Sequence, residues 1–280
     1  MILPQPGPGF EWFDTPRGPA LACRPLAAIA PHLFTTRSWA LGRAPGAGDP
    51  AWAEVADALG VSPPRLARLH QVHGNASVVA GAVDAGRSSD VPQADIVVGR
   101  YPDTVVAVQA ADCVPILIAD ERRGVVAAAH AGWRGLALGV PAAAVSALGE
   151  AFESRAEDLV VALGPSIGAC CYEVGPEVRQ AFADAGFDGE ALGRWFREGP
   201  ASLPQNPSMP RVSGAGRQDR LYFDGWAAVR DQLCAAGVPE GRIFSAGLCT
   251  ASHPDALCSY RREGSAAGRM AAAIRPSPRP

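Results

Sequence analysis

Short apolar runs rich in β-branched residues dominate the middle of the chain, and polar or glycine-containing segments separate them. Runs of this length and composition are typical of buried β-strands. They predict strands over residues 96–98, 105–109, 114–119 and 125–129. Further strands are expected over residues 33–37, 66–72, 77–80, 159–163 and 243–248.

Helical patterns lie mostly in the second half of the chain, over residues 51–59, 136–152, 176–185 and 223–236. Strands that form hairpins, followed by helices, favour an α+β fold over a doubly wound parallel sheet. No change of composition divides the chain, so we expect a single domain over residues 1–280. Its irregular parts are expected to be a lead-in at 1–20, loops at 43–48, 81–93 and 198–219, and a disordered tail at 275–280.

Two of the predicted strands flank a polar run at residues 120–123, which Gly124 closes. Charged residues followed by glycine between apolar runs indicate a β-hairpin. If the loop is 120–123, counting back along both strands places Cys113 opposite His130. Directly opposed residues have Cβ atoms about 4.5–5.5 Å apart. A thiol and an imidazole at that separation can share a metal ion or form a nucleophile–base pair.

The composition excludes several classes of function. A net charge of −3 with 19% charged residues predicts no nucleic-acid-binding surface. No apolar run approaches the roughly 20 residues of a membrane helix, and the first residues lack the form of a signal peptide, so we expect a cytoplasmic protein with no membrane partner. The seven irregularly spaced cysteines indicate free thiols. All 25 basic residues are arginine, which excludes lysine-based catalysis and leaves arginine, histidine or backbone N–H groups to bind anions.

His73, in the turn-like segment 71–74, is a third candidate beside Cys113 and His130. Two histidines and one cysteine with an open fourth position form a catalytic zinc arrangement, and such a metal lowers the pKa of bound water to about 7. A second interpretation makes Cys113 a thiolate nucleophile, His130 its base, and Asp112 or another acid the group that orients the base. In a third, Cys113 only packs, as a free cysteine usually does. The local sequence leaves all three open.

Two arginines near these residues are candidates for anion binding. Arg134 lies between Gly132 and Gly135, which allows close backbone approach and leaves the guanidinium to form a forked contact with an anion. Arg261 follows Tyr260, whose ring can stack on a base.

Seven segments, in their order along the chain, together resemble the laccase-domain family, also described as YfiH-like or multicopper polyphenol oxidase. They are FTTR (34–37), QVHG (71–74), ADCVP (111–115), HAGWRG (130–135), GPSIG (164–168), CYEVG (171–175) and SYRR (259–262). The resemblance implies a YfiH-like fold, which is a single α+β domain with mixed β-sheets layered between helices. It also implies metal ligands at His73, Cys113 and His130, with zinc, or else copper, as the metal.

Members of this family are described as purine nucleoside phosphorylases that also deaminate adenosine. The resemblance therefore implies a metal-dependent enzyme that phosphorolyses adenosine, inosine, guanosine or methylthioadenosine and deaminates adenosine, with phosphate as a second substrate. On this interpretation the arginines hold phosphate and two tyrosines stack on the base; the candidates are Arg37, Arg134, Arg261, Tyr172 and Tyr260.

Two alternatives remain from the residues and the family. One is a cysteine hydrolase or peptidoglycan-precursor editing enzyme that uses Cys113. The other, polyphenol oxidation, is less expected, because five histidines do not supply a usual multicopper cluster. After Arg37, residues 38–46 depart from the Gly-Gly-x-Ser turn of the family, so substrate preference is expected to differ. We expect a monomer or a small homo-oligomer.

Overall fold

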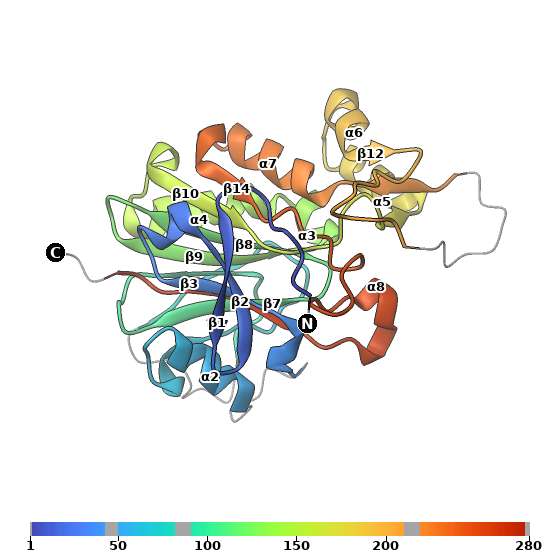
Figure 1. Cartoon of the computed structure of the whole chain (residues 1–280). Coiled ribbons are helices and arrows are strands. Elements are labelled where there is room, and N and C mark those ends of the chain that lie inside the picture. The colour runs from blue at the N-terminus through green and yellow to red at the C-terminus, as the bar shows by residue number, and fades with distance from the viewer. Residues whose placement is uncertain (1, 43–49, 82–90, 210–218, 278–280) are drawn as a thin grey trace.

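The computed structural model describes residues 2–42, 50–81, 91–209 and 219–277, and the structural statements below concern these residues. The chain forms four layers, in which two six-stranded sheets pack face to face and helices cover the outer face of each (Figure 1). A small three-stranded sheet extends from one end together with two helices. The predicted α+β fold, with mixed sheets layered between helices, is confirmed.

The first sheet is mixed and contains both the earliest and the latest strands of the chain. Its strands, in spatial order, are β1 (Phe10–Thr15), β2 (Gly18–Cys23), β3 (His32–Thr35), β15 (Met270–Ile274), β7 (Val105–Ala110) and β4 (Leu66–Ala67). Helix α2 (Pro50–Ala58) covers its outer face through Trp52 and Val55, which pack against Val105 and Ala107 of β7. The helix expected over residues 51–59 is confirmed.

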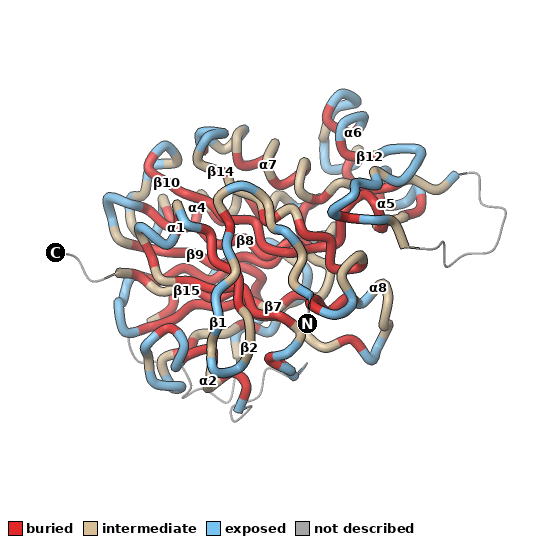
Figure 2. Tube along the Cα trace, viewed as in Figure 1, coloured by how far each residue is buried: buried red, intermediate tan, exposed pale blue. Residues whose placement is uncertain are grey.

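The second sheet forms the centre of the molecule. Its strands, in spatial order, are β14 (Ile243–Ser245), β10 (Leu159–Leu163), β8 (Val114–Asp120), β9 (Val125–Ala131), β6 (Ile96–Gly99) and β5 (Ser77–Val79). Successive residues of a strand face opposite sides of its sheet. In β8, Ile116 and Ile118 pack under the helices, whereas Leu117 and Ala119 pack against the first sheet. Both faces are buried (Figure 2), which explains why these strands form continuous apolar runs in the sequence.

Helices α4 (Val140–Phe152) and α7 (Gly225–Ala235) cover the outer face of the second sheet. One continuous helix was expected over residues 136–152, but the chain forms α3 (Trp133–Ala137) and α4, with a break at Gly139. Gly139 has φ +80, a left-handed value that glycine adopts without a steric penalty. The remaining elements are β11 (Glu173–Val174), β12 (Phe196–Arg197), β13 (Leu221–Phe223), α1 (Arg24–Ala27), α5 (Pro176–Asp184), α6 (Gly189–Trp195), α8 (Tyr260–Glu263), and the 3-10 turns η1 (Arg37–Trp39), η2 (Pro63–Arg65), η3 (Ala156–Asp158), η4 (Glu240–Arg242) and η5 (Gly264–Ala266).

The two ends of the chain differ from the sequence-based expectation. The lead-in at 1–20 is not irregular, because β1 and β2 pair antiparallel from Phe10 opposite Cys23 to Thr15 opposite Gly18. Residues 275–277 are not a disordered tail: Arg275 Nε donates a hydrogen bond to the Leu59 carbonyl at 2.6 Å. Residues 278–280, the predicted loop at 43–48, and residues 82–90 and 210–218 of the predicted loops at 81–93 and 198–219 lie outside the described residues.

Candidate metal centre and substrate cavity

Three segments that are far apart in the sequence bring His73, Cys113 and His130 together. His73 lies in the segment before β5, Cys113 immediately precedes β8, and His130 is near the end of β9. One potential ligand atom from each lies within 4.8 Å of the other two. The two imidazole rings are 4.9 Å apart between centroids and nearly perpendicular, at 78°. Two nitrogens and one sulfur at this spacing can converge on a single metal ion.

The β8–β9 hairpin differs from the predicted register by two positions. Pro115, not Cys113, lies opposite His130, because the loop is 121–124. A shift of two keeps every side chain on the same face of the sheet, so Cys113 still lies beside His130, in a diagonal position. The residue opposite Cys113 by this register is Gly132.

Gly132 leaves the space that this cluster needs. A Cβ atom at this position would lie 2.9 Å from Cys113 Sγ and 2.9 Å from His73 Cδ2. Its backbone, at φ −78, is open to any residue, so the requirement for glycine is steric. The donor set and the cleared space next to it fit a bound metal ion.

Asp95, directly before β6, links two members of the cluster and was not singled out by the sequence. Its carboxylate is fully buried and accepts a hydrogen bond from His130 Nδ1 at 2.8 Å. It also accepts the backbone N–H groups of Val72, His73 and Gly74, at 3.1, 3.1 and 2.7 Å. Because a carboxylate only accepts, Nδ1 of His130 carries a proton, and Nε2 is the nitrogen that faces the cluster.

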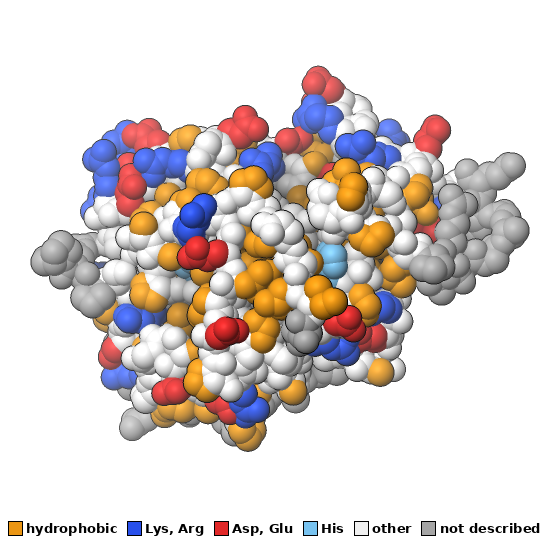
Figure 3. Space-filling model, in the orientation of Figure 1, with side chains coloured by type: hydrophobic (Ala, Val, Ile, Leu, Met, Phe, Trp, Pro, Cys, Tyr) orange, Lys and Arg blue, Asp and Glu red, His pale blue; other side chains and the backbone are white. Residues whose placement is uncertain are grey.

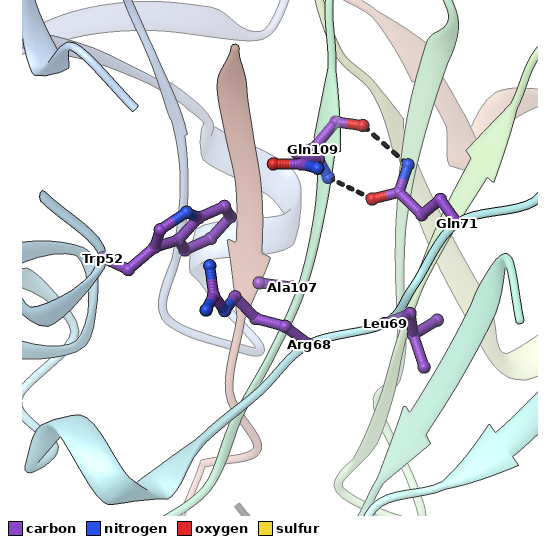
Figure 4. Close-up of a pocket in the computed structure, with 6 residues that line it drawn as sticks. All are labelled: Trp52, Arg68, Leu69, Gln71, Ala107 and Gln109. Atoms are coloured by element: carbon purple, nitrogen blue, oxygen red, sulfur yellow. Dashed lines mark hydrogen bonds between the residues drawn. The ribbon is translucent and has the colours of Figure 1, made fainter. Parts of the chain in front are cut away.

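The segment around His73 has an unusual backbone that these bonds stabilise. His73 has φ +61, a left-handed value that is uncommon for residues other than glycine. Three successive N–H groups directed at one carboxylate hold it in that conformation. On its other side, Gln71 Nε2 donates to the Gln109 carbonyl and Gln71 Oε1 accepts the Gln109 N–H, both at 2.8 Å (Figure 4). The His73 segment is therefore attached to β7 of the first sheet and to Asp95 of the second.

Cys113 and His130 shift each other's pKa. Burial alone would raise the pKa of the Cys113 thiol, but the charge and hydrogen bonds of His130 and His73 lower it to about 6. Burial alone would lower the pKa of His130, but the charge of Cys113 and the hydrogen bond to Asp95 raise it to about 9. In the absence of a metal ion, the two side chains therefore form a thiolate–imidazolium pair near neutral pH.

Asp112, which the sequence offered as an orienting acid, points elsewhere. Its carboxylate accepts hydrogen bonds from Thr250 Oγ1 and from the Arg261 backbone N–H, both at 2.6 Å. Its own backbone has φ +91. Asp112 thus fixes the segment after β14 and helix α8 against the start of β8, whereas Asp95 contacts His130.

A cavity of about 620 Å³ opens beside the cluster. Seven of the eight residues predicted for the site line it, namely His73, Cys113, His130, Arg134, Tyr172, Tyr260 and Arg261. Arg37 is not among the lining residues; its guanidinium pairs with Glu263 at 3.1 Å and with the Pro254 carbonyl.

The cavity wall combines cations with aromatic rings. The guanidinium of Arg134 lies 4.2 Å from the ring centre of Trp133, and that of Arg261 lies 5.2 Å from the ring centre of Tyr172. Within the described part of the chain, Arg134 makes no hydrogen bond or ion pair with another side chain. Arg269, which the sequence analysis did not select, also lines the cavity. The arrangement suits a ligand with a flat ring and an anionic group.

Outside the cavity, the surface shown in Figure 3 carries acidic and basic side chains intermixed, without an extended area of one sign. Over the described ranges, every helix is too short or too polar to cross a membrane.

The chain is similar to several known proteins. The family model described as multi-copper polyphenol oxidoreductase laccase matches residues 42–276. A purine nucleoside phosphorylase of Deinococcus radiodurans is 34% identical over 87% of this chain and 88% of its own length. The adenosine deaminase RL5, from an unknown prokaryotic organism, is 33% identical over 62% of this chain and 59% of its own length. The crystal structure of YlmD from Geobacillus stearothermophilus is similar with a TM-score of 0.76 and 28% identity, over 95% of this chain and 99% of that one.

Proposed function

Because the chain belongs to the multi-copper polyphenol oxidoreductase laccase family, whose relatives include a purine nucleoside phosphorylase and an adenosine deaminase, we propose that it is a metal-dependent enzyme that processes purine nucleosides. The proposed reactions are phosphorolysis and the deamination of adenosine. The observation that carries the proposal is the convergence of His73, Cys113 and His130 at a cavity lined by aromatic rings and arginines.

His73, Cys113 and His130 would hold the metal. Zinc suits two imidazoles and one thiolate with an open fourth position. When bound, it supplies Lewis-acid chemistry to a substrate atom or a water molecule. Asp95 holds the Nδ1 proton of His130 so that Nε2 faces the cluster, and the low pKa of Cys113 keeps its sulfur as a thiolate near neutral pH. Cys113 is therefore already a thiolate, and a bound metal ion would replace the Nε2 proton of the His130 imidazolium.

The cavity wall provides the contacts for the rest of the substrate. Tyr172 is half-buried and lines the cavity, and its contacts with Arg261 and Phe223 hold the ring in place, so we assign it the packing contact with a purine. Tyr260 is 52% exposed and also lines the cavity, where it can cover a bound base. Arg134, which stacks on Trp133 and is otherwise unpaired among the described residues, is our candidate for the phosphate contact.

The test is incubation of zinc-loaded protein with adenosine, with and without phosphate. Adenine and ribose 1-phosphate that form only with phosphate establish phosphorolysis, and inosine that forms without phosphate establishes deamination. The Arg134→Ala variant should raise the KM for phosphate. Arg122→Ala, which lies in the loop at the opposite end of the β8–β9 hairpin, should leave it unchanged. Absence of every one of these products from folded, zinc-loaded protein would contradict the proposal.

A second candidate function uses the same residues without a metal. Cys113, His130 and Asp95 form a nucleophile, base and orienting acid in series, since His130 bonds Asp95 and lowers the pKa of Cys113. This favours a cysteine hydrolase as the alternative. His73 is the residue that distinguishes the two, because a thiol–imidazole pair does not need a second imidazole beside it. A hydrolase would keep its turnover in the presence of a chelator and in His73→Ala, whereas the metal enzyme would lose it in both.

A further inference from the structure

A second cluster of thiols lies apart from the cavity, behind one of its walls. Cys170 and Cys171 lie in the turn that precedes β11, and Cys249 follows β14. All three are buried and free, and their sulfur atoms lie within 4.8 Å of one another. Ile167 and Ala251 pack around them. Three thiols that share one enclosed space, with no disulfide among them, form a sulfur-only donor set.

The backbone around these sulfurs provides hydrogen-bond donors. The Gly168 N–H points at Cys249 Sγ at 3.3 Å, and the Met209 N–H points at Cys171 Sγ, also at 3.3 Å. Cys249 Sγ and Cys171 Sγ therefore each accept a backbone N–H, a role that a thiolate keeps when it also binds a metal ion, although the Cys171 thiol can also donate to the Pro207 carbonyl at 3.7 Å. Such N–H groups stabilise the negative charge that several adjacent thiolates would accumulate.

Ser252 supplies an oxygen beside two of the three sulfurs. Its Oγ lies 3.6 Å from Cys170 Sγ and 3.5 Å from Cys171 Sγ. It donates its proton to the Pro207 carbonyl at 2.7 Å, so its lone pairs are available on the side of the sulfurs. For a tetrahedral zinc ion with Zn–S near 2.3 Å and Zn–O near 2.0 Å, the sulfur–oxygen edge is about 3.5 Å. The observed separations match that edge.

We propose that Cys170, Cys171, Cys249 and Ser252 form a second metal site, which takes a thiophilic divalent cation of the zinc class. Three thiolates select such an ion over magnesium or calcium, which prefer oxygen ligands. Binding replaces three thiol protons, which are released to solvent.

The second site would be structural and would support the cavity. Cys171 directly precedes Tyr172, which lines the cavity, and Cys249 precedes Thr250, whose hydroxyl bonds Asp112 at 2.6 Å. An ion shared by these cysteines would tie the two segments together behind the cavity wall.

The experiment uses Co²⁺ as the probe in the full-length Cys113→Ala variant, whose candidate metal centre retains no sulfur. Any sulfur-to-cobalt charge-transfer absorption then reports other thiolates. We expect one tightly bound Co²⁺ with the intensity of three thiolates, displaced by one equivalent of Zn²⁺. With Cys249→Ser or Cys171→Ser added, the band should no longer reach the intensity of three thiolates. Adding Cys234→Ser, at a half-buried cysteine on α7, should leave it unchanged.

Absence of the band in folded Cys113→Ala protein, in which the second cluster is intact, would overturn the proposal even if the serine variants failed to fold. A band that persists at full intensity with Cys171→Ser and Cys249→Ser combined would overturn it as well. Neither readout depends on turnover, so the result is independent of the proposed nucleoside activity.

Discussion

Asp95→Asn is the substitution that tests the architecture of the candidate metal centre most directly. The carboxylate accepts four hydrogen bonds, three from the backbone of the His73 segment and one from His130. An amide has one acceptor oxygen, and its NH₂ group must face donors on the other side. If the NH₂ faces the backbone N–H groups of Val72 and Gly74, these two partly buried donors lose their acceptor. If it faces His130, the imidazole proton must move to Nε2, the atom proposed to bind the metal.

Both orientations of the amide carry a cost that can be measured. An unsatisfied buried donor costs about 1–3 kcal/mol, and because Val72 and Gly74 are only partly buried we expect about 1–3 kcal/mol for the two together in the metal-free protein. Loss of the carboxylate that orients a histidine ligand lowers metal affinity about 10- to 100-fold. Urea denaturation in the presence of a chelator measures the first effect, and competition for zinc with a chromophoric chelator measures the second.

Asp103→Asn is the matched control. Its side chain is 60% exposed and pairs with Arg65 at 3.3 Å, so it should change stability by less than about 1 kcal/mol and leave zinc affinity unaltered. If Asp95→Asn bound zinc within twofold of the unmodified protein and unfolded at the same urea concentration, the orienting role assigned to Asp95 would be wrong.

Three further predictions follow from the described residues. Gly132→Ala should lower zinc affinity about tenfold or more in the chelator assay, because its Cβ would press on Cys113 and His73; unchanged affinity would contradict the steric argument. Burial lowers the pKa of His32 from 6.5 to about 4, so the unfolded chain binds that proton more tightly than the folded protein does. The free energy of unfolding should therefore fall by up to about 3 kcal/mol as the pH drops from 6.5 to 4. Urea titrations at several pH values should show that the free energy of unfolding of His32→Gln depends less steeply on pH. Asp112→Ala should destabilise the protein by about 1–3 kcal/mol, because the hydroxyl of the buried Thr250 loses its acceptor. Thermal or urea unfolding checks this against the smaller loss expected for Asp112→Asn.

The sequence predicts the central sheet well because its strands are buried on both faces. Continuous apolar runs identified β6 to β9, and the polar run ending in Gly124 identified the hairpin. The predicted register of the hairpin was wrong by two positions, because the local sequence does not distinguish a four-residue loop that begins at Asp120 from one that begins at Glu121. In contrast, β1 has only Phe10 buried, so it offers no apolar run to detect. The C-terminal strand β15 has a core of three alanines, which carries little β preference.

The site was predictable only in part, because some of its residues act through contacts that form only in the folded protein. His73, Cys113 and His130 stand out by residue type and by motif, so their convergence could be anticipated. Asp95 carries no local signal, because its four hydrogen bonds exist only once β6 lies beside β9 and the His73 segment folds over both. Arg37 belongs to a recognisable motif, yet it pairs with Glu263 away from the cavity.

The attachment of the His73 segment to both sheets has a consequence for folding. Gln71 bonds the backbone of β7 in the first sheet, and the N–H groups that follow it bond Asp95 in the second. The ligand set is therefore complete only when the two sheets have docked, and neither sheet alone offers a binding site. An ion that binds only the docked state adds its free energy to the global unfolding equilibrium. Zinc would then slow the separation of the two sheets, and zinc uptake during refolding would report when the two sheets dock.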